Sequence, residues 1–426
     1  MIGSFKLNLS THLYGVSLYT GEMKVTLEDI QKAQKTIQDM IIHTPCDLSR
    51  SCSQLLDDGT HTEIYLKLEN TQRTGSFKMR GASNKIASLN EAERKRGVIA
   101  CSAGNHAQGV ALSARINNVK SLIVMPQTAP LTKINATENY GAEVILHGQT
   151  FDEAKEYAYK LANEKGYVFV HPYEDEKVIA GQGTIGLEVY EQVKDLDMMV
   201  VPIGGGGLIS GIAVALKTLN PNIKIIGVQT QAVDTMFQMF KKTIPDKSKL
   251  KPTIADGIAV QSPSLKMFDS FISKYVDDIV TVDEGEIAEA IVFLLERAKT
   301  VAEGAGAAAL AALLSRKIKP LLKTCVIVCG GNIDLNIISQ VIQRGQIRRG
   351  RLCEMSVVVP DVPGSLSQLT KILAEHKANV LEVHHDRIKH GLNLKETRID
   401  FVIETTSQTH IEKIRESLQK WGAKVG

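Results

Sequence analysis

The chain has 426 residues, which is long enough for two or three domains with a sizeable hydrophobic core. Hydrophobic residues make up 43% of it and charged residues 23%, and the formal net charge is only +3. This charge is too small to argue for nucleic-acid binding, and no apolar run reaches the roughly 18 residues that a transmembrane helix needs. We therefore expect a small-molecule partner, with no nucleic acid and no membrane.

The N-terminal residues 1–22 show neither a clear hydrophobic periodicity nor the regions of a signal peptide. We interpret them as an N-terminal extension, and we predict a helix just after them with Thr26 as N-cap and Glu28 in the first turn. The six cysteines are scattered and include no CxxC pair, which suits a reducing compartment. The chain is therefore expected to be cytoplasmic.

Short apolar runs alternate with amphipathic helical stretches between about residues 60 and 330. The runs are apolar at nearly every position, which indicates strands buried on both faces, as in parallel sheets covered by helices. They predict an α/β protein. The runs are GVIAC, SLIVM, MMVVPI, IKIIGV and TCVIVC.

The pattern changes at Cys353. A strand, a helix, two strands and a second helix follow within about 75 residues, which is most of a ferredoxin-like βαββαβ unit. The basic stretch from Gln343 to Arg351 is too charged for a core strand and is interpreted as a linker. These changes predict a domain boundary near residue 350.

Four glycines in PIGGGGLISG, Pro202–Gly211, stand between a predicted buried strand and a predicted helix. Glycines let several backbone N–H groups point into one concavity, and the helix adds the positive end of its dipole, so a phosphate can bind there. The motif lacks the Lys-Ser or Lys-Thr of a Walker loop and the GxGxxG pattern of a dinucleotide fold. A mobile glycine turn is the alternative interpretation.

Two further motifs follow predicted strands. CSAGNHAQG offers Ser102, Asn105 and His106, which could hold a carboxylate or a ring hydroxyl. A capped helix start would explain Ser102 or Asn105 alone. VIVCGGN contains Cys329, which taken alone is a small buried hydrophobe. Neither Cys329 nor Cys325 has companions at zinc-ligand spacing, so zinc is not expected.

Lys78, in the stretch TGSFKMRGA, would by itself be interpreted as a surface charge. Its neighbours favour another interpretation. Gly75 and Gly81 flank it, Phe77 could cover an aromatic ring, and a helix N-terminus would lower the pKa of the lysine amine. An activated lysine, a phosphate cradle and a partner for a ring nitrogen together indicate pyridoxal phosphate.

The chain resembles the fold-type II pyridoxal-phosphate enzymes, and within them the threonine/serine dehydratases. The sequence VPDVPGSLSQLTKIL near the C-terminus resembles an ACT regulatory domain. The resemblance implies an extension at 1–22, a catalytic domain at 23–350 and an ACT domain at 351–426. The catalytic domain would have two parallel-sheet α/β subdomains, the small one inserted at about 98–174. Seven motifs carry the resemblance in family order: ENTQRTGSFKMRGA, SAGNHAQGVA, HPYEDEKVIAGQGTIGLE, GGGGLISG, TIADGIAV, EGAGAAALAA and CGGN.

The resemblance also implies roles for single residues. Lys78 would carry the cofactor covalently and, once displaced by substrate, remove the Cα proton, while Cys329 would face the pyridine nitrogen. The implied cofactor-binding residues are Phe77, Lys78, Asn105, Gly204, Gly205, Gly206, Gly207, Leu208 and Cys329, and the implied substrate-binding residues are Ser102, Ala103, Asn105, His106 and Gln182.

Three positions bear on the type of reaction and on metals. A thiol such as that of Cys329 at the pyridine nitrogen leaves the ring neutral and favours prompt β-elimination over a long-lived carbanion. In serine racemases a serine stands just before the Gly-Asn-His of the second motif, whereas this chain has Ala103, which cannot transfer a proton. At Gln229 related enzymes often have a glutamate that helps to hold a cation, so no metal site is predicted.

The activity implied by the resemblance is deamination of L-threonine to 2-oxobutanoate and ammonia, with L-serine as a secondary substrate. Alternatives are a serine dehydratase, serine racemase or threonine synthase of the same fold, and a catalytically decayed amino-acid sensor. No extra basic cluster supports a threonine synthase, and the intact cofactor positions disfavour the sensor. The preference between threonine and serine stays open, because one methyl group is worth only about 1 to 3 kcal/mol in a pocket.

The ACT resemblance implies allosteric control by a small amino acid, with isoleucine or valine as the expected effector. The ligand loop would be PDVPGSL, and a tail that serves only oligomer contacts is the alternative. A homodimer or homotetramer is expected, and a biosynthetic role is not distinguished from a catabolic one. The candidate allosteric residues are Asp361, Gly364, Leu366 and Asn379.

Overall fold

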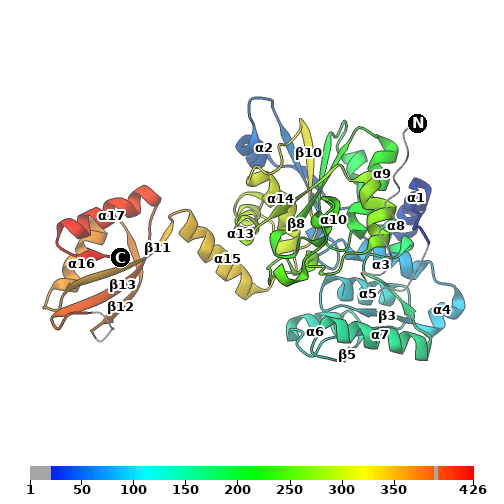
Figure 1. Ribbon diagram of the computed structural model, residues 1–426, viewed down its shortest axis with the longest axis horizontal. Coiled ribbons are helices and arrows are strands. Elements are labelled where there is room, and N and C mark those ends of the chain that lie inside the picture. The colour runs from blue at the N-terminus through cyan, green and yellow to red at the C-terminus, as the bar shows by residue number, and fades with distance from the viewer. Residues whose placement is uncertain (1–20, 388–391) are drawn as a thin grey trace.

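The computed structural model describes residues 21–387 and 392–426, so the predicted N-terminal extension lies almost wholly outside the described residues. Three sheets organise the described chain, two before residue 330 and one after residue 350. Figure 1 shows the third sheet standing apart from the other two and joined to them by helix α15, Leu335–Arg348. Within the described part, no helix is long and apolar enough to cross a membrane.

The largest sheet has six strands in the order β1-β2-β10-β7-β8-β9. All neighbours are parallel except β1, which runs antiparallel to β2 at the edge. The prediction of doubly buried parallel strands is confirmed for the central strands, and every residue of β7 is buried. The edge strand β1 was not predicted, because its three residues carry no apolar run. The strands are β1 Cys46–Leu48, β2 Glu63–Leu68, β7 Met198–Pro202, β8 Lys224–Thr230, β9 Asp278–Val282 and β10 Lys323–Val328.

Helices cover both faces of this sheet, with α8 and α9 on one side and α13 and α14 on the other (Figure 1). Helix α1 begins where predicted. The Thr26 side chain accepts a hydrogen bond from the N–H of Asp29, and the Asp29 carboxylate accepts one from the N–H of Thr26. The helices of this part are α1 Leu27–Ile37, α2 Arg50–Leu56, α3 Lys78–Ala87, α8 Glu176–Gln192, α9 Gly207–Leu219, α10 Thr235–Phe240, α11 Leu265–Met267, α12 Ser273–Tyr275, α13 Glu284–Phe293 and α14 Gly304–Leu314.

A second sheet has four parallel strands in the order β5-β4-β3-β6. Its strands all fall inside the segment predicted as the small subdomain, about 98–174, and it lies below the large sheet in Figure 1. The exact domain limits stay a prediction. The elements are α4 Glu91–Arg96, β3 Val98–Cys101, α5 Asn105–Ile116, β4 Ser121–Met125, α6 Leu131–Asn139, β5 Glu143–Leu146, α7 Phe151–Lys165 and β6 Val168–Phe169.

The C-terminal unit is a complete βαββαβ fold with the strand order β12-β13-β11-β14. The predicted ferredoxin-like arrangement is confirmed, and the short β14 adds its last strand. The stretch predicted as a linker does connect the two parts, but it is helical as far as Arg348. The elements are β11 Leu352–Pro360, α16 Ser365–Glu375, β12 Asn379–Asp386, β13 Glu396–Glu404, α17 Gln408–Lys420 and β14 Lys424–Val425.

Glycines let three helices of the large part approach closely. A Cβ on Gly181 of α8 would lie 2.7 Å from the backbone oxygen of Arg80 in α3, and one on Gly183 would lie 2.9 Å from the oxygen of Gly211 in α9. Contacts this short leave no room for a methyl group. Helix α8 therefore holds α3, which begins at Lys78, next to α9, which begins at the glycine loop.

A buried network of charges ties α3 to α8 and to β2. Arg80 donates to Glu69 at 2.7 Å and to Glu188 at 2.6 Å. Lys67 donates to Glu188 at 2.5 Å, and all four side chains are at most 3% exposed. Buried ions are tolerated only where pairing and hydrogen bonding are nearly complete. The network therefore fixes the position of α3 relative to its neighbours.

Replacing Arg80 by methionine should lower the free energy of unfolding by about 3 to 5 kcal/mol, because the buried carboxylate of Glu69 would lose its ion-pair partner. Urea unfolding followed by circular dichroism measures this change. The matched control is Lys95→Met, which breaks an exposed pair with Glu91 and should cost less than about 1 kcal/mol. Equal losses for the two variants would contradict a structural role of the buried network.

Candidate active site

Lys78 is the first residue of α3, and the backbone before it is paired with the end of β10. The N–H of Phe77 donates to the oxygen of Cys329 at 3.1 Å, and the N–H of Gly331 donates to the oxygen of Gly75 at 2.9 Å. Ser76 and Gly330 form an isolated antiparallel bridge between these segments. The lysine and the predicted ring-nitrogen partner, Cys329, are thus brought together although they lie far apart in the sequence.

The amine of Lys78 has a defined environment. Its Nζ donates to the oxygen of Pro172 at 3.1 Å and lies 5.1 Å from the centre of the Phe77 ring. Burial lowers the pKa of Lys78 to about 8, while the nearby Cys329 and Glu303 oppose this shift. A lowered pKa was expected, and burial is its largest cause. A substantial fraction of the amine is therefore neutral near pH 7 to 8, as a nucleophile or proton acceptor requires.

The glycine loop between β7 and α9 is covered closely by Tyr173. A Cβ on Gly205 would come within 2.2 Å of the Tyr173 ring, and one on Gly207 within 2.9 Å of its Cα. Gly206 has a φ of 92°, in the left-handed region that favours glycine. The hydroxyl of Ser210, in the first turn of α9, is buried without a hydrogen-bond partner among the described residues. A phosphate at the start of α9 fits this cradle.

Asn105 lies in a chain of hydrogen bonds that links the small and large sheets. Its Nδ2 donates to Glu303 at 2.7 Å, and its Oδ1 accepts from Nδ2 of Asn332, also at 2.7 Å. Asn332 donates in turn to the backbone oxygen of Thr74, a few residues before Lys78. These bonds fix the orientation of the Asn105 amide, which can still offer its second N–H to a ring hydroxyl.

Burial shifts the pKa values of two groups beside Asn105. It raises the pKa of Glu303 to about 7, and the charge of Asp256 adds to this shift. It also raises the pKa of the Cys329 thiol well above its usual value, with a further contribution from Glu303. Cys329 therefore stays protonated and neutral, which fits the prediction of an uncharged partner for a pyridine nitrogen.

The predicted substrate residues of the second motif surround the start of α5. Ser102 and Ala103 are half-buried, and the hydroxyl of Ser102 accepts from the N–H of Gly104 at 3.1 Å. His106 is buried, and its Nε2 donates to the oxygen of Val170 at 2.8 Å. Burial lowers the pKa of His106 to about 3. The imidazole is thus neutral at ordinary pH, and any role it has is that of a hydrogen-bonding group.

Gln182 occupies a different environment. It is 1% exposed, between α8 and α3, and its Oε1 accepts from the N–H of Gly81 at 3.2 Å. Its Nε2 has no hydrogen-bond partner among the described residues. The residue therefore contacts the helix that begins with Lys78 and keeps one unused donor, and its predicted substrate contact stays a prediction.

Sequence analysis did not assign Glu303, Asn332 or Tyr173 to the site. Glu303 and Asn332 stand inside the motifs EGAGAAALAA and CGGN, and Tyr173 inside HPYEDE. Glu303 is the only acid in its motif, which was the one available signal. Its partner Asn105 is 198 positions away in the sequence, so no local pattern could reveal the pairing.

The candidate allosteric residues belong to two places within the C-terminal unit. Asp361 is exposed in the loop after β11, Gly364 caps α16 with a φ of 96°, and Leu366 packs partly against the core of this unit. Asn379 donates to Glu404 at 2.8 Å, at the end of β13 that is farther from this loop. Within one chain, Asn379 is thus not brought to the loop.

Within the described residues, no group of three or more His, Cys, Asp or Glu side chains could hold a metal ion. The buried Gln229, where related enzymes often have a glutamate, accepts a hydrogen bond from the N–H of Phe237 at 2.8 Å. Its side-chain oxygen therefore helps to hold helix α10.

The titration of Glu303 should make the free energy of unfolding of the wild-type protein depend on pH, and the substitution Glu303→Gln should remove this contribution. Because the pKa of Glu303 is raised from 4.5 to about 7, the folded protein keeps a proton that the unfolded chain releases in this range. Wild-type stability therefore falls as the pH rises from about 4.5 to 7, whereas a glutamine cannot lose a proton. The stability of the variant relative to wild type should rise by roughly 3 kcal/mol over this window.

Urea unfolding midpoints of both proteins at pH 5, 6, 7 and 8 check this prediction. The exposed Glu138→Gln serves as the control, and its difference from wild type should stay flat with pH. A flat difference for Glu303→Gln as well would show that the buried carboxyl titrates normally.

Known protein families match both the part of the chain that contains Lys78 and the glycine loop and the C-terminal unit. A family model described as "Pyridoxal-phosphate dependent enzyme" matches residues 37–330, and the ACT domain model matches residues 354–420. An L-threonine ammonia-lyase of Thermotoga maritima is 49% identical over 401 residues, which cover 94% of this chain and 99% of that protein.

Two solved structures are similar in fold and in sequence. The processed form of threonine deaminase isoform 2 from Solanum lycopersicum has a TM-score of 0.67 at 34% identity, covering 76% of this chain and 92% of that one. A serine racemase from Dictyostelium discoideum has a TM-score of 0.67 at 38% identity, covering 73% of this chain and 99% of that one. The chain therefore belongs to the family of pyridoxal-phosphate-dependent enzymes, and it carries an ACT domain behind the part that binds this cofactor.

Proposed function

We propose that this protein deaminates L-threonine to 2-oxobutanoate and ammonia, with L-serine as a secondary substrate. The observation that carries the proposal is the amine of Lys78, whose pKa is lowered to about 8 and which lies near the neutral thiol of Cys329. The amine also donates to Pro172, whose neighbour Tyr173 covers the glycine cradle. The similarity to L-threonine ammonia-lyases over nearly the whole chain, ACT domain included, supports the choice of substrate.

The residues around Lys78 fit pyridoxal phosphate. The N–H groups at Gly204–Leu208 and the start of α9 would hold its phosphate, Phe77 would pack against its ring, and Asn105 would donate to its ring hydroxyl. Cys329 would face its pyridine nitrogen. When bound, this cofactor supplies an electron sink that makes the Cα proton of an amino acid removable.

Lys78 is the proposed proton acceptor. The pKa of its amine is about 8, which is close to neutral pH. The amine donates a hydrogen bond to the oxygen of Pro172 at 3.1 Å, and this bond orients it. It would take the Cα proton of threonine, after which the β-hydroxyl takes up a proton and leaves as water. The enamine that remains would then take up water and break down to 2-oxobutanoate and ammonia. Ser102, Gln182 and the backbone N–H of Asn105 are the proposed hydrogen-bond donors to the substrate carboxylate, with Ala103 and His106 beside them.

The main alternative is a racemase, because serine racemases have similar structures. Racemisation needs a second group that returns a proton to the opposite face of Cα. Ala103 stands where serine racemases have a serine, and a methyl group cannot carry out that transfer. We therefore favour elimination over racemisation. A decayed amino-acid sensor is less consistent with a lysine that is so strongly activated.

We further propose that the ACT domain controls this activity by binding isoleucine or valine at the loop of Asp361, Gly364 and Leu366. The proposed pathway is isoleucine biosynthesis.

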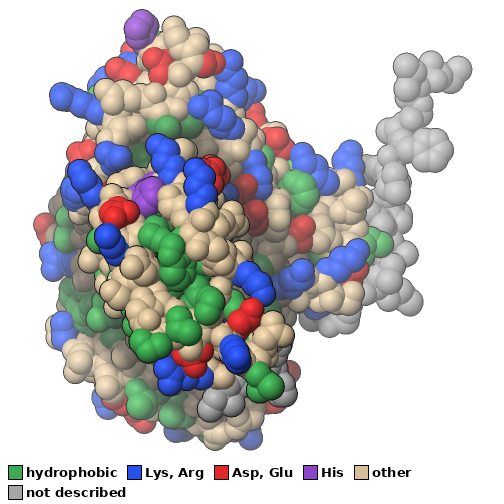
Figure 2. Space-filling model, turned by 90° about the vertical axis from the view of Figure 1, so that its left-hand side faces the viewer, with side chains coloured by type: hydrophobic (Ala, Val, Ile, Leu, Met, Phe, Trp, Pro, Cys, Tyr) green, Lys and Arg blue, Asp and Glu red, His purple; other side chains and the backbone are tan. Residues whose placement is uncertain are grey.

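We also propose that the protein is a homodimer or homotetramer. Figure 2 shows apolar side chains gathered on the face of the ACT end that points to the viewer, which supports such an assembly. The exposed large apolar residues of the ACT domain include Val362, Leu381, Val383, Leu394 and Trp421.

The proposed location of the protein is the cytoplasm. All six cysteines are free, which supports a reducing compartment.

Replacing Lys78 by alanine should reduce threonine turnover by about 100- to 10,000-fold, because the variant lacks the proton acceptor. The measurement is 2-oxobutanoate release from threonine and pyruvate release from serine, with circular dichroism to verify folding. Lys32→Ala, an exposed lysine of α1, is the control and should keep full activity. Wild-type protein that releases neither product would overturn the proposal, and formation of D-serine would favour the racemase.

A chain that ends at Gly350 should keep its activity and lose its response to isoleucine and valine, because it lacks the loop of Asp361. Steady-state rates with threonine and with serine, each with and without the two effectors, test this. If the full-length enzyme ignores both amino acids, the ACT domain has another role, and the loop is not their site.

A further inference from the structure

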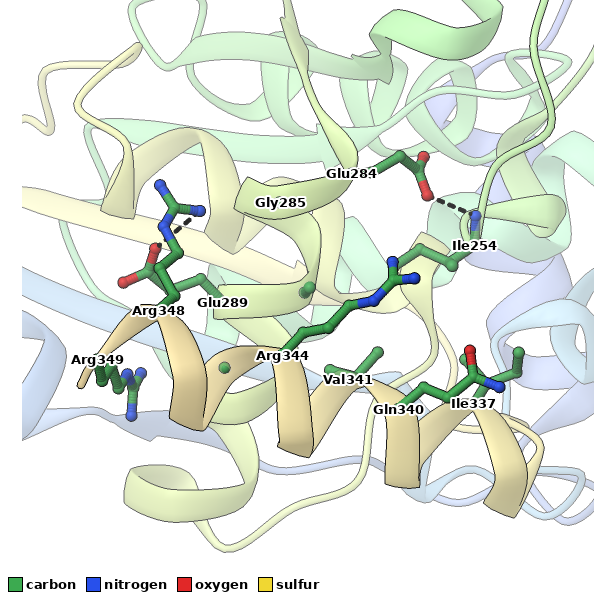
Figure 3. A pocket seen from close by; sticks show the side chains of 12 residues that line it. Ile254, Glu284, Gly285, Glu289, Ile337, Gln340, Val341, Arg344, Arg348 and Arg349 are labelled. Atoms are coloured by element: carbon green, nitrogen blue, oxygen red, sulfur yellow. Dashed lines mark hydrogen bonds and ion pairs between the residues drawn. The ribbon is translucent and has the colours of Figure 1, made fainter. Parts of the chain in front are cut away.

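A groove lies between helices α13 and α15, away from Lys78 and from the ACT loop. It encloses about 140 Å³. Figure 3 shows Ile337, Val341 and Arg344 of α15 facing Gly285 and Glu289 of α13, with Ile254 closing one end. A cavity of about 150 Å³ is large enough for benzene, so this groove suits a ligand of similar size.

The charged groups of the groove leave one cation unpaired. Arg348 pairs with Glu289 at 3.6 Å, and Arg349 pairs with Glu296 at 2.6 Å. Arg344 has no hydrogen bond or ion pair with any described residue, and its guanidinium extends across the groove towards Ile254 (Figure 3). A guanidinium of this kind is suited to hold a carboxylate through two parallel hydrogen bonds.

The two acids that line the groove, Glu284 and Glu289, both have partners already. Both oxygens of Glu284 accept hydrogen bonds, one from the hydroxyl of Thr253 and one from the N–H of Ile254 at 2.9 Å. The apolar part of the lining comes from Ala288, Ile337 and Val341, and Gln340 adds a polar amide. The groove thus combines a free cation with a short apolar wall.

We infer that this groove binds a small aliphatic carboxylate and that such binding changes the activity of the site at Lys78. The carboxylate would pair with Arg344, and a chain of about four carbons would lie against Ala288 and Val341. Both a 2-oxo acid and a branched amino acid have this chemistry. The effect on activity rests on the proposed function, whereas the binding itself does not.

The contacts around Ile254 lead from the groove to the cofactor cradle. Ile254 is followed by the segment 255–258, and the Cα of Ile258 lies 3.0 Å from where a Cβ on Gly204 would stand. Asp256 of the same segment pairs with Lys133 of helix α6 at 3.0 Å and contributes to the raised pKa of Glu303. A ligand that presses on Ile254 therefore acts on the glycine loop and on the contact between Asp256 and Lys133.

Calorimetric titration of the full-length holoenzyme tests the binding. Butanoate is the main probe, because it lacks the amino group that an amino-acid loop would recognise, and butylamine is the matched cation. 2-Oxobutanoate and L-isoleucine distinguish a product from an amino-acid ligand. Arg344→Gln should weaken butanoate binding at least about 10-fold. Ala288→Leu should weaken it similarly by filling the groove, and butylamine should not bind.

Arg387→Gln is the matched control in the ACT domain, because Arg387 pairs with Asp361 of the predicted effector loop at 3.3 Å. It should leave butanoate binding unchanged. Binding that survives Arg344→Gln, or binding lost only in Arg387→Gln, overturns the inference. A changed oligomer mass in Arg344→Gln or Ala288→Leu without any binding of butanoate would show that the groove is a contact between copies of the chain, which also overturns it.

The same variants separate this inference from the proposed function. Threonine turnover without any added carboxylate tests the proposed function alone, and Arg344→Gln should leave it unchanged. Butanoate should alter turnover by wild type at least about two-fold at saturation, and this response should vanish in Arg344→Gln. An enzyme that binds butanoate at Arg344 with no change in turnover would contradict the coupling to Lys78.

Discussion

The site depends first on the buried charge of Arg80, which stands two residues after Lys78 in α3. Its guanidinium is fully buried and pairs with Glu69 and Glu188, while Lys67 completes the charge balance on Glu188. Because an unpaired buried ion costs several kcal/mol, the helix cannot shift along α8 without breaking these bonds. The same constraint that stabilises the fold therefore keeps the reactive amine at a fixed place, next to the end of β10.

The titratable groups of the candidate site follow the opposite electrostatic rule. Arg80 remains charged because its partners are charged, whereas Lys78, Glu303 and His106 are buried with few opposite charges, so burial moves their pKa values towards the neutral form. Lys78 and Glu303, whose pKa values are about 8 and about 7, can gain or lose a proton near pH 7 at little cost, whereas His106, with a pKa of about 3, stays neutral there. The paired charges around Arg80 thus hold the helix that carries Lys78, while burial leaves Lys78 and Glu303 able to exchange a proton near neutral pH.

Much of this site was predictable from the sequence, because its chemistry is concentrated in short motifs. The parallel strands, the glycine loop, the position of Lys78 at a helix start and the βαββαβ unit all have local patterns, which the structure reproduces. What could not be predicted depends on pairing over long distances. The partners Arg80 and Glu188 are separated by 108 positions, and the orphaned amide nitrogen of Gln182 is a property of packing alone. The helical state of the basic stretch up to Arg348 was missed because its charges were taken as a sign of an open linker, although on α15 they line one wall of a groove.

Helix α15 has two roles in this architecture, since it forms that groove wall and also leads into the ACT domain (Figure 1). At its C-terminal end, Arg349 and Arg351 both pair with Glu296, just after α13. The hydroxyl of Thr405 in the ACT domain donates to the oxygen of Gly350 between them. A rotation of the ACT domain about this junction would therefore be felt first by α13 and α15, and the segment from Ile254 to Ile258 would carry it to the glycine loop. The proposed regulation would therefore reach Lys78 through packed helices, which can shift by small steps without breaking the sheet on which the site is built.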